Sequence, residues 1–176
     1  MYINLIKVGL KDLRRFGENI NRKINYTRRI GVYGFILYRN KILLTEQKML
    51  KKFIETSLPG GGVDTGEQYM HALYREVLEE TGWHIQVLRR EGAFQRFTYM
   101  PEYNVWAHKI CHVYLCKGVY QKTRILEEGH RYLIADYQKA LDTLIDPGFK
   151  HFVKKIFKDQ SNKRSIKPGF GQLSAG

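Results

Sequence analysis

The stretch Gly60–Trp83, GGGVDTGEQYMHALYREVLEETGW, joins a glycine-rich segment to a helix with three glutamates on one face. Glu76, Glu79 and Glu80 stand at positions i, i+3 and i+4, a spacing that an α-helix brings together. The acidic face borders an apolar stripe formed by Met70, Leu73, Tyr74 and Val77. The stretch therefore predicts a helix that packs on a core and carries an acidic edge.

The ends of this helix also have sequence signals. Thr65 with Gln68 three positions on has the pattern of a capping box, and Gly82 suits a left-handed C-terminal cap. The run 59–62, Pro-Gly-Gly-Gly, interrupts any regular structure before the helix. A helix of about four turns directly after a glycine loop is expected.

The acidic face has a cost that calls for a counter-ion. Like charges at these spacings destabilise an isolated helix by about 0.2–0.5 kcal/mol per pair, and only Arg75 offers a local positive charge. Hard divalent cations with a preference for oxygen ligands would relieve the repulsion. The neighbouring glycines let backbone and substrate phosphates approach closely. Metal-assisted cleavage of a phosphoanhydride is the chemistry indicated, with a solvated acidic helix face as the alternative.

Strand and helix patterns continue on both sides of this stretch. Ile30–Tyr38 is an unbroken apolar run typical of a strand buried on both faces, with a turn at 39–41 before the next strand. Further strands are expected at Ile42–Thr45, Ile85–Leu88, Gly92–Tyr99 and Ile110–Cys116, and closing helices at Ala135–Ile145 and Phe149–Phe157. This order predicts an α/β or α+β sandwich around a mixed β-sheet.

Length and composition limit the class of protein. The chain has 176 residues with 43% apolar and 13% aromatic side chains, enough for the core of one domain. No apolar run reaches the roughly 18 residues that span a bilayer, and the two cysteines, Cys111 and Cys116, match neither a disulfide framework nor zinc spacing. These features exclude membrane-spanning, collagen-like and disulfide-rich classes and predict a soluble, cytoplasmic protein.

The net charge of +13 is unevenly distributed. Residues 1–29 carry eight basic and two acidic side chains and residues 150–176 seven and one, whereas residues 30–149 are close to neutral. We therefore expect a basic, amphipathic N-terminal flank at 1–28, a central domain at 29–158 and a basic tail without structure at 159–176. Because the excess charge lies in the flanks, nucleic acid is a less favoured partner than a small molecule.

The residues quoted above resemble a known family. Gly61-x5-Glu67-x7-Arg75-Glu76-Val77-x-Glu79-Glu80-x-Gly82-Trp83 is similar to the Nudix box, G-x5-E-x7-R-E-U-x-E-E-x-G-U, with Trp83 in place of the last aliphatic residue. Every fixed position of the motif is filled. The resemblance covers residues from Arg29 to about Phe157 and implies the family's α/β/α sandwich. It also implies hydrolysis of a nucleoside diphosphate linked to another group, dependent on Mg²⁺ or Mn²⁺.

The resemblance further implies roles for the residues of the motif. Glu79 and Glu80 would be the principal metal ligands, and Glu76 would be a ligand or the general base. Arg75 would orient the carboxylates, and Glu67 would support the metal directly or through water.

Two ligands outside the helix are also implied. The Gly60 carbonyl would coordinate the metal, and an acidic residue from a later loop would add to it. In the run Glu127-Glu128-Gly129-His130 we favour Glu128, with a solvated turn as the alternative.

The substrate is less well indicated. Arg96, Tyr99 and Trp106 fall in an aromatic cluster after the motif and are candidate substrate contacts, although such aromatics often fill a core. Tyr99 stands sixteen positions after Trp83, where a tyrosine resembles family members that act on dinucleoside polyphosphates. The LPGGG sequence before the helix is shared with members that act on nucleoside triphosphates, so both classes remain open.

Two other functional classes are compatible with the sequence. A non-catalytic nucleotide sensor or RNA-binding module of the same fold would be expected to have lost a glutamate of the motif, and this chain has lost none. A hydrolase acting on RNA 5′ ends would use the basic flanks to hold the RNA backbone. The oligomeric state is not encoded in any feature identified above.

Overall fold

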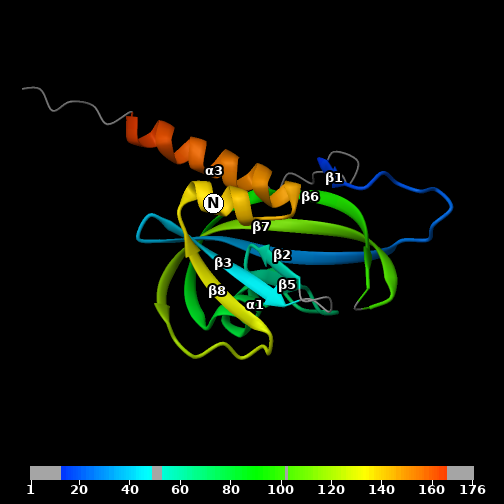
Figure 1. Ribbon diagram of the computed structural model, residues 1–176, viewed down its shortest axis with the longest axis horizontal. Coiled ribbons are helices and arrows are strands. Elements are labelled where there is room, and N and C mark those ends of the chain that lie inside the picture. Colours follow the sequence, from blue (N-terminus) through cyan, green and yellow to red (C-terminus); the bar gives the residue numbers. More distant parts are fainter. Residues whose placement is uncertain (1–12, 49–52, 102, 166–176) are drawn as a thin grey trace, which may run out of the picture.

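The computed structural model describes residues 13–48, 53–101 and 103–165. Within these ranges, five strands precede the first helix, three strands follow it, and two helices come last; the strands form a single sheet with helices on both sides (Figure 1). The strands are β1 (Arg15–Gly17), β2 (Thr27–Tyr38), β3 (Lys41–Lys48), β4 (Ile54–Ser57), β5 (Gly60–Gly62), β6 (Trp83–Met100), β7 (Val105–Gln121) and β8 (His130–Ala135). The helices are α1 (Tyr69–Thr81), α2 (Tyr137–Thr143) and α3 (Pro147–Ser165).

The sheet is mixed, as the sequence predicts. Its main path runs β1-β6-β7-β2-β3-β4, with β5 added to β2 and β8 added to β3. The long β6–β7 hairpin is antiparallel, whereas β7 pairs in parallel with β2 from Thr27↔Ala107 to Leu37↔Lys117. Because β2 lies between β7 and the strands that follow it, it forms the centre of the sheet.

The two faces of the sheet have separate cores. On one face α1 packs through Ala72, Leu73 and Val77 against Val32 and other sheet residues. On the other face α2 and α3 cover a core that includes Phe35, Phe94, Phe149 and Val153. Figure 1 shows α3 above the sheet and α1 below it. The expected three-layer α/β/α sandwich, with a β2 strand buried on both faces, is confirmed.

Strands β2 and β3 separate part of the way along their length. They pair only over Ile36–Tyr38, and beyond this point β4 pairs with β3 while β5 pairs with β2. The Pro59 carbonyl accepts a hydrogen bond from the Gly34 N–H at 2.8 Å, which fixes the turn between β4 and β5 in the split. The glycine run predicted to interrupt regular structure therefore forms the short strand β5.

The helix α1 starts later than the capping-box prediction. Its N-cap is Gln68, without a side-chain cap, while Gly66 adopts φ +82° and the Glu67 N–H bonds the Asp64 carbonyl. Residues 64–67 thus form a turn instead of the first helical turn, and the Thr65 cap is wrong. The predicted left-handed cap is confirmed, with Gly82 at φ +73°.

Two more boundaries differ from the sequence prediction. Ala135 closes β8, where it pairs with Ile42, and α2 begins only after Asp136, whose side chain caps it by accepting the Lys139 N–H. Helix α3 continues to Ser165, so residues 159–165 are helical and not an unstructured tail.

The boundaries expected for the flanks fall inside regular elements. Strand β1 joins the sheet by pairing in parallel with β6, and β2 begins at Thr27, so the sheet already includes residues before position 29. The boundary at residue 158 lies within α3. The first twelve residues of the expected amphipathic flank lie outside the described residues.

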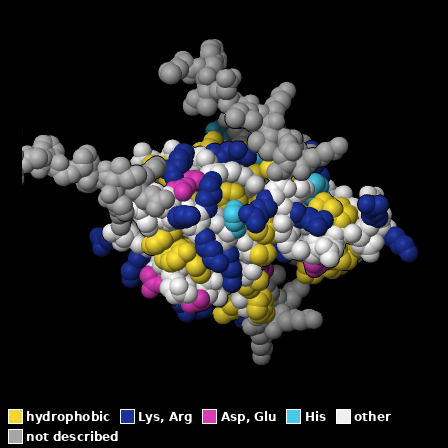
Figure 2. All heavy atoms as spheres, turned by 90° about the horizontal axis from the view of Figure 1, so that it is seen from above, with side chains coloured by type: hydrophobic (Ala, Val, Ile, Leu, Met, Phe, Trp, Pro, Cys, Tyr) yellow, Lys and Arg dark blue, Asp and Glu magenta, His cyan; other side chains and the backbone are white. Residues whose placement is uncertain are grey.

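Charged side chains are widespread on the surface. Lys and Arg side chains are spread over the face seen from the α3 side in Figure 2, between apolar patches. Among the helices of the described residues, none combines the length and apolar character needed to cross a bilayer.

Candidate active site

Arg75, in the middle of α1, forms hydrogen bonds within the helix and with the residues that precede it. Its guanidinium forms two hydrogen bonds with the Glu67 carboxylate, both at 2.9 Å, and one with Glu76 Oε1 at 2.7 Å. It also reaches Glu79 Oε2 at 3.3 Å and the Gly62 carbonyl at 3.2 Å. These bonds lower the pKa of Glu67 to about 2. A single planar cation therefore holds three carboxylates and the glycine strand in fixed orientations.

Glu80 is the deepest of the three helix glutamates. It is only 7% exposed, and its Oε2 accepts a hydrogen bond from the Gly60 N–H at 2.9 Å. Burial raises the pKa of Glu80 well above its usual range, and burial likewise raises the pKa of Glu76. Because the charged forms are costly here, a bound cation would stabilise both ionised carboxylates.

The glycines of β5 leave room for these carboxylates. Gly60 adopts φ +139°, and a Cβ there would collide with the Val32 carbonyl. A Cβ on Gly61 would collide with the Glu76 carboxylate. Gly60 and Gly61 therefore allow the close contact between β5, β2 and α1.

The loop before β8 adds a second set of potential metal ligands. The carbonyl of Glu79, in the last turn of α1, accepts the N–H groups of Leu126 and Glu127 at 2.9 and 3.1 Å. These bonds satisfy a helix-end carbonyl that would otherwise lack a partner. They also bring the Glu127 side chain to the acidic face of α1.

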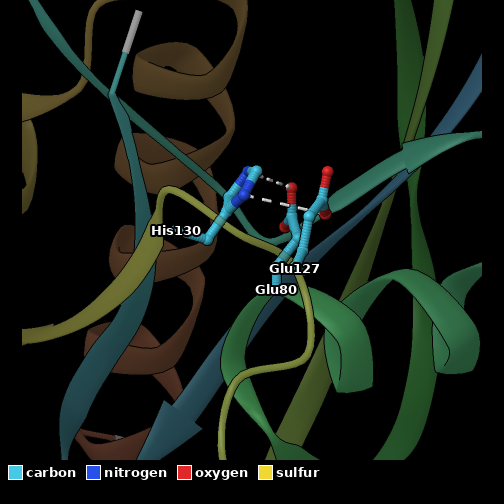
Figure 3. Close-up of side chains that lie close together, drawn as sticks. All are labelled: Glu80, Glu127 and His130. Carbon is cyan, nitrogen blue, oxygen red and sulfur yellow. Dashed lines mark ion pairs between the residues drawn. The ribbon is translucent and has the colours of Figure 1, made fainter.

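Glu80, Glu127 and His130 meet at one point (Figure 3). One potential ligand atom from each of the three lies within 4.8 Å of the others. His130 Nε2 is 3.5 Å from Glu80 Oε1, and Nδ1 is 3.7 Å from Glu127 Oε2. The Nδ1 atom is buried and has no hydrogen-bond partner among the described residues. A buried ring nitrogen that makes no hydrogen bond among the described residues, next to two carboxylates, fits a divalent cation.

A cavity of about 1420 Å³ opens above these groups. Its acidic wall carries Glu55, Glu76, Glu79, Glu80 and Glu127. A second group of lining residues, from β2, β6, β7 and the β6–β7 turn, comprises Arg29, Tyr33, Met100, Pro101, Tyr103 and Lys109. The lining thus combines an acidic group with a basic and aromatic group.

The structure brings together some of the residues expected at the site. Glu76, Glu79, Glu80 and Arg75 all line the cavity, as does Gly60, whose N–H and not its carbonyl is the group seen to bond Glu80. Glu67 is turned to Arg75 and is not among the lining residues. The roles of these residues as ligands or catalysts stay predictions.

Other expected residues lie elsewhere. Glu128 is exposed and does not line the cavity, whereas its neighbour Glu127 does. The candidate substrate contacts Arg96, Tyr99 and Trp106 also lie outside it. Arg96 forms an ion pair with the buried Asp146 directly before α3, and the rings of Tyr99 and Trp106 pack on each other at 5.3 Å.

Several cavity residues were not found from the sequence. His130 stood in the loop that the sequence singled out, but its burial depends on pairing of β8 with β3. Arg29 and Lys109 are paired across the parallel strands β2 and β7. Tyr103 belongs to the turn between β6 and β7. Their shared location follows from strand order, for which the local sequence offers no signal.

Comparisons with known proteins agree with the fold. A curated protein of Bacillus subtilis (strain 168) named "Putative 8-oxo-dGTP diphosphatase" is 34% identical over 77 residues, 43% of this chain and 50% of that protein. The chain thus spans about half the length of this curated relative.

Solved structures also have the same fold. A NUDIX hydrolase from Nitrosomonas europaea superposes with a TM-score of 0.64 at 20% identity, covering 76% of this chain and 90% of that one. A MutT protein from Methanosarcina mazei Go1 has a TM-score of 0.60 at 25% identity, covering 80% and 99%. The family model for the NUDIX domain matches residues 27–155, and the chain therefore belongs to the NUDIX family.

Proposed function

We propose that this chain hydrolyses a pyrophosphate bond in a nucleoside diphosphate linked to another group, with Mg²⁺ or Mn²⁺ as cofactor. The observation that carries the proposal is the meeting of Glu80, Glu127 and His130 beside Glu76 and Glu79 in one cavity. Four carboxylates with a buried imidazole nitrogen that makes no hydrogen bond among the described residues are a donor set for a divalent cation that binds phosphates.

The residues that would hold the metal are Glu79, Glu80, Glu127 and His130. When bound, the metal would neutralise phosphate charge and lower the pKa of a water molecule. The Gly60 N–H holds the Glu80 carboxylate in position, and the Glu79 carbonyl holds the loop that carries Glu127. The ligand set is thus fixed by backbone groups of three different elements.

We assign proton acceptance to Glu76. Its Oε1 is held by Arg75 at 2.7 Å, and its Oε2 lies beside Gly61 at the cavity wall. A carboxylate fixed in this way can take the proton of a water molecule as that water attacks phosphorus. Arg75 then acts as a positioning residue, because it also orients Glu79 and anchors Glu67.

For the substrate we propose a nucleoside or deoxynucleoside triphosphate or a dinucleoside polyphosphate. The name of the Bacillus subtilis relative makes 8-oxo-dGTP the first compound to test. Tyr103 and Phe53 are exposed aromatic side chains at the cavity and are suitable partners for a base. We propose a small nucleotide in the cytoplasm, and not nucleic acid, as the physiological partner.

Phosphate release from a substrate panel tests the proposal. The purified full chain would be incubated with Mg²⁺ or Mn²⁺ and 8-oxo-dGTP, dGTP, dinucleoside tetraphosphate, ADP-ribose and 5′-triphosphorylated RNA. We expect hydrolysis of at least one small nucleotide, products separated by anion exchange, and loss of this activity in Glu80→Gln. Tight nucleotide binding without any product would contradict hydrolysis and favour a sensor; cleavage of RNA alone would favour the RNA 5′-end class.

A further inference from the structure

The cavity lining includes two basic residues at neighbouring positions of paired strands. Arg29 on β2 and Lys109 on β7 are Cα partners in the parallel pairing of these strands, and both line the cavity. Residues paired in this way point to the same face of a sheet. The two basic side chains therefore project from the same face of β2 and β7 into the cavity lining.

Lys109 has no carboxylate partner within 4.0 Å in the part of the chain that the structure describes. Its ammonium lies 6.0 Å from the ring centroid of Tyr33 and beside the Tyr33 hydroxyl. Burial raises the pKa of Tyr33 to about 12, so this hydroxyl is neutral at physiological pH and does not cancel the lysine charge. Cys111, close by, is likewise kept neutral because burial raises the pKa of its thiol to about 12.

Arg29 lies over an aromatic ring of the cavity lining. Its Cζ lies 4.9 Å from the ring centroid of Tyr103, which comes from the β6–β7 turn. A stacked guanidinium keeps its N–H donors at the edge of the plane, where an anion can accept them. Tyr103 thus restricts Arg29 without neutralising it.

Neither cation has an acidic partner among the described residues, and an anion bound in the cavity would be attracted by both. We propose that Arg29 and Lys109 form a second anion subsite, which binds a substrate phosphate other than those held at the glutamate wall. This inference rests on the proposed function, because it assigns a role in substrate binding to the basic residues of the same cavity. It identifies the substrate class as nucleotides with three or more phosphates in a chain.

Binding of inorganic tripolyphosphate in EDTA tests the subsite separately from catalysis. Without metal the glutamate wall repels the probe, so binding in the cavity reports on Arg29 and Lys109. Isothermal titration calorimetry at low ionic strength would compare the full chain with Lys109→Met and Arg29→Gln. We expect each substitution to weaken tripolyphosphate binding at least about tenfold.

Two matched controls define the location. Lys117→Met removes an exposed lysine of the same strand outside the cavity, and Lys48→Met removes a cavity lysine from β3. Both controls should bind tripolyphosphate as the wild type does, and any binding to the basic flanks is common to all variants. Equal affinity in all five proteins, or loss only in Lys48→Met, would overturn the subsite. Thermal unfolding of each variant confirms that the fold is retained.

Kinetics separate this inference from the proposed function. Lys109→Met should raise KM at least about tenfold for a nucleoside triphosphate with a small change in kcat, and have little effect on KM for ADP-ribose, which has two phosphates. Equal rises in KM for both substrates would overturn the inference while hydrolysis by the wild type still supports the proposed function. Tripolyphosphate binding at Lys109 in a chain that hydrolyses nothing would support the subsite and contradict the proposed function.

Discussion

Glu80 Oε2 accepts the N–H of Gly60 at 2.9 Å, a bond between residues twenty positions apart in the chain. It joins the last turn of α1 to the first residue of β5 in a buried position. Because the bond is made by a carboxylate, folding carries a charge into the interior that only a cation or a proton can offset. The group that we expect to bind metal therefore reduces the stability of the metal-free protein.

Replacing Glu80 with glutamine should separate activity from stability. The glutamine side chain retains an oxygen for the Gly60 N–H but has no charge to bury, so the metal-free variant should be at least as stable as the wild type. Its kcat should fall by about 100-fold or more, because a metal ligand is lost. Urea unfolding in EDTA and steady-state assays in Mg²⁺ check the two parts. A clear loss of stability would show that the carboxylate charge is favourable even without metal.

The stability gap between these two proteins should depend on pH. A carboxyl whose pKa is raised by folding binds its proton more tightly in the folded chain, so its contribution to stability falls as pH rises. For Glu80 this fall starts near its ordinary pKa of 4.5 and continues through the raised pKa. In EDTA the advantage of Glu80→Gln over wild type should grow across this window.

Unfolding free energies measured in EDTA from pH 4.5 upward would show this trend. Titratable groups far from position 80 are shared by the two proteins and cancel in the difference. Saturating Mg²⁺ should close the gap, because a ligand that binds only the folded state stabilises it. A gap that is constant with pH would mean that Glu80 has the same pKa in the folded and unfolded chains.

Glu127 and Glu128 form a matched pair of neighbours. Glu127 lines the cavity beside His130, whereas Glu128 is exposed outside it. We expect Glu127→Gln to weaken Mn²⁺ binding and to lower kcat about 10–100-fold, and Glu128→Gln to have little effect. Calorimetric titration with Mn²⁺ and turnover assays measure both. The reverse order would restore Glu128 as the loop ligand.

Gly61 and Gly62 provide a second matched pair. A Cβ at position 61 would displace the Glu76 carboxylate, while a Cβ at position 62 would meet nothing within 4 Å. Gly61→Ala should therefore lower kcat at least about tenfold, since misplacing a reacting group slows catalysis, and Gly62→Ala should be nearly as active as wild type. Circular dichroism verifies that both variants fold. Full activity of Gly61→Ala would argue against Glu76 as the proton acceptor.

The sequence predicted features that depend on local periodicity. The acidic face of α1, its Gly82 cap and the buried strand β2 are confirmed, because each is set by the spacing of residues within one element. The start of α1 differs from the prediction because Arg75 draws Glu67 into the turn that precedes the helix. That contact joins residues of different local structure, and a capping pattern does not include it.

The pairing of basic residues in the cavity lining could not be predicted in the same way. Arg29 and Lys109 are eighty positions apart and meet only because β2 and β7 are parallel neighbours. The expected substrate residue Arg96 is instead neutralised by Asp146, which directly precedes α3. Strand order, and not composition, decides which basic side chain of this chain faces the cavity.

The acidic and the aromatic residues of the cavity belong to different elements, which has a consequence for engineering. The glutamates belong to α1 and the loop before β8, whereas Tyr103 and its neighbours belong to the β6–β7 turn. If the proposed function is correct, exchanging that turn for one from another family member should alter the contacts to the base and leave the glutamates in place. A different substrate selectivity could therefore be introduced through this turn alone, with the residues of α1 left unchanged.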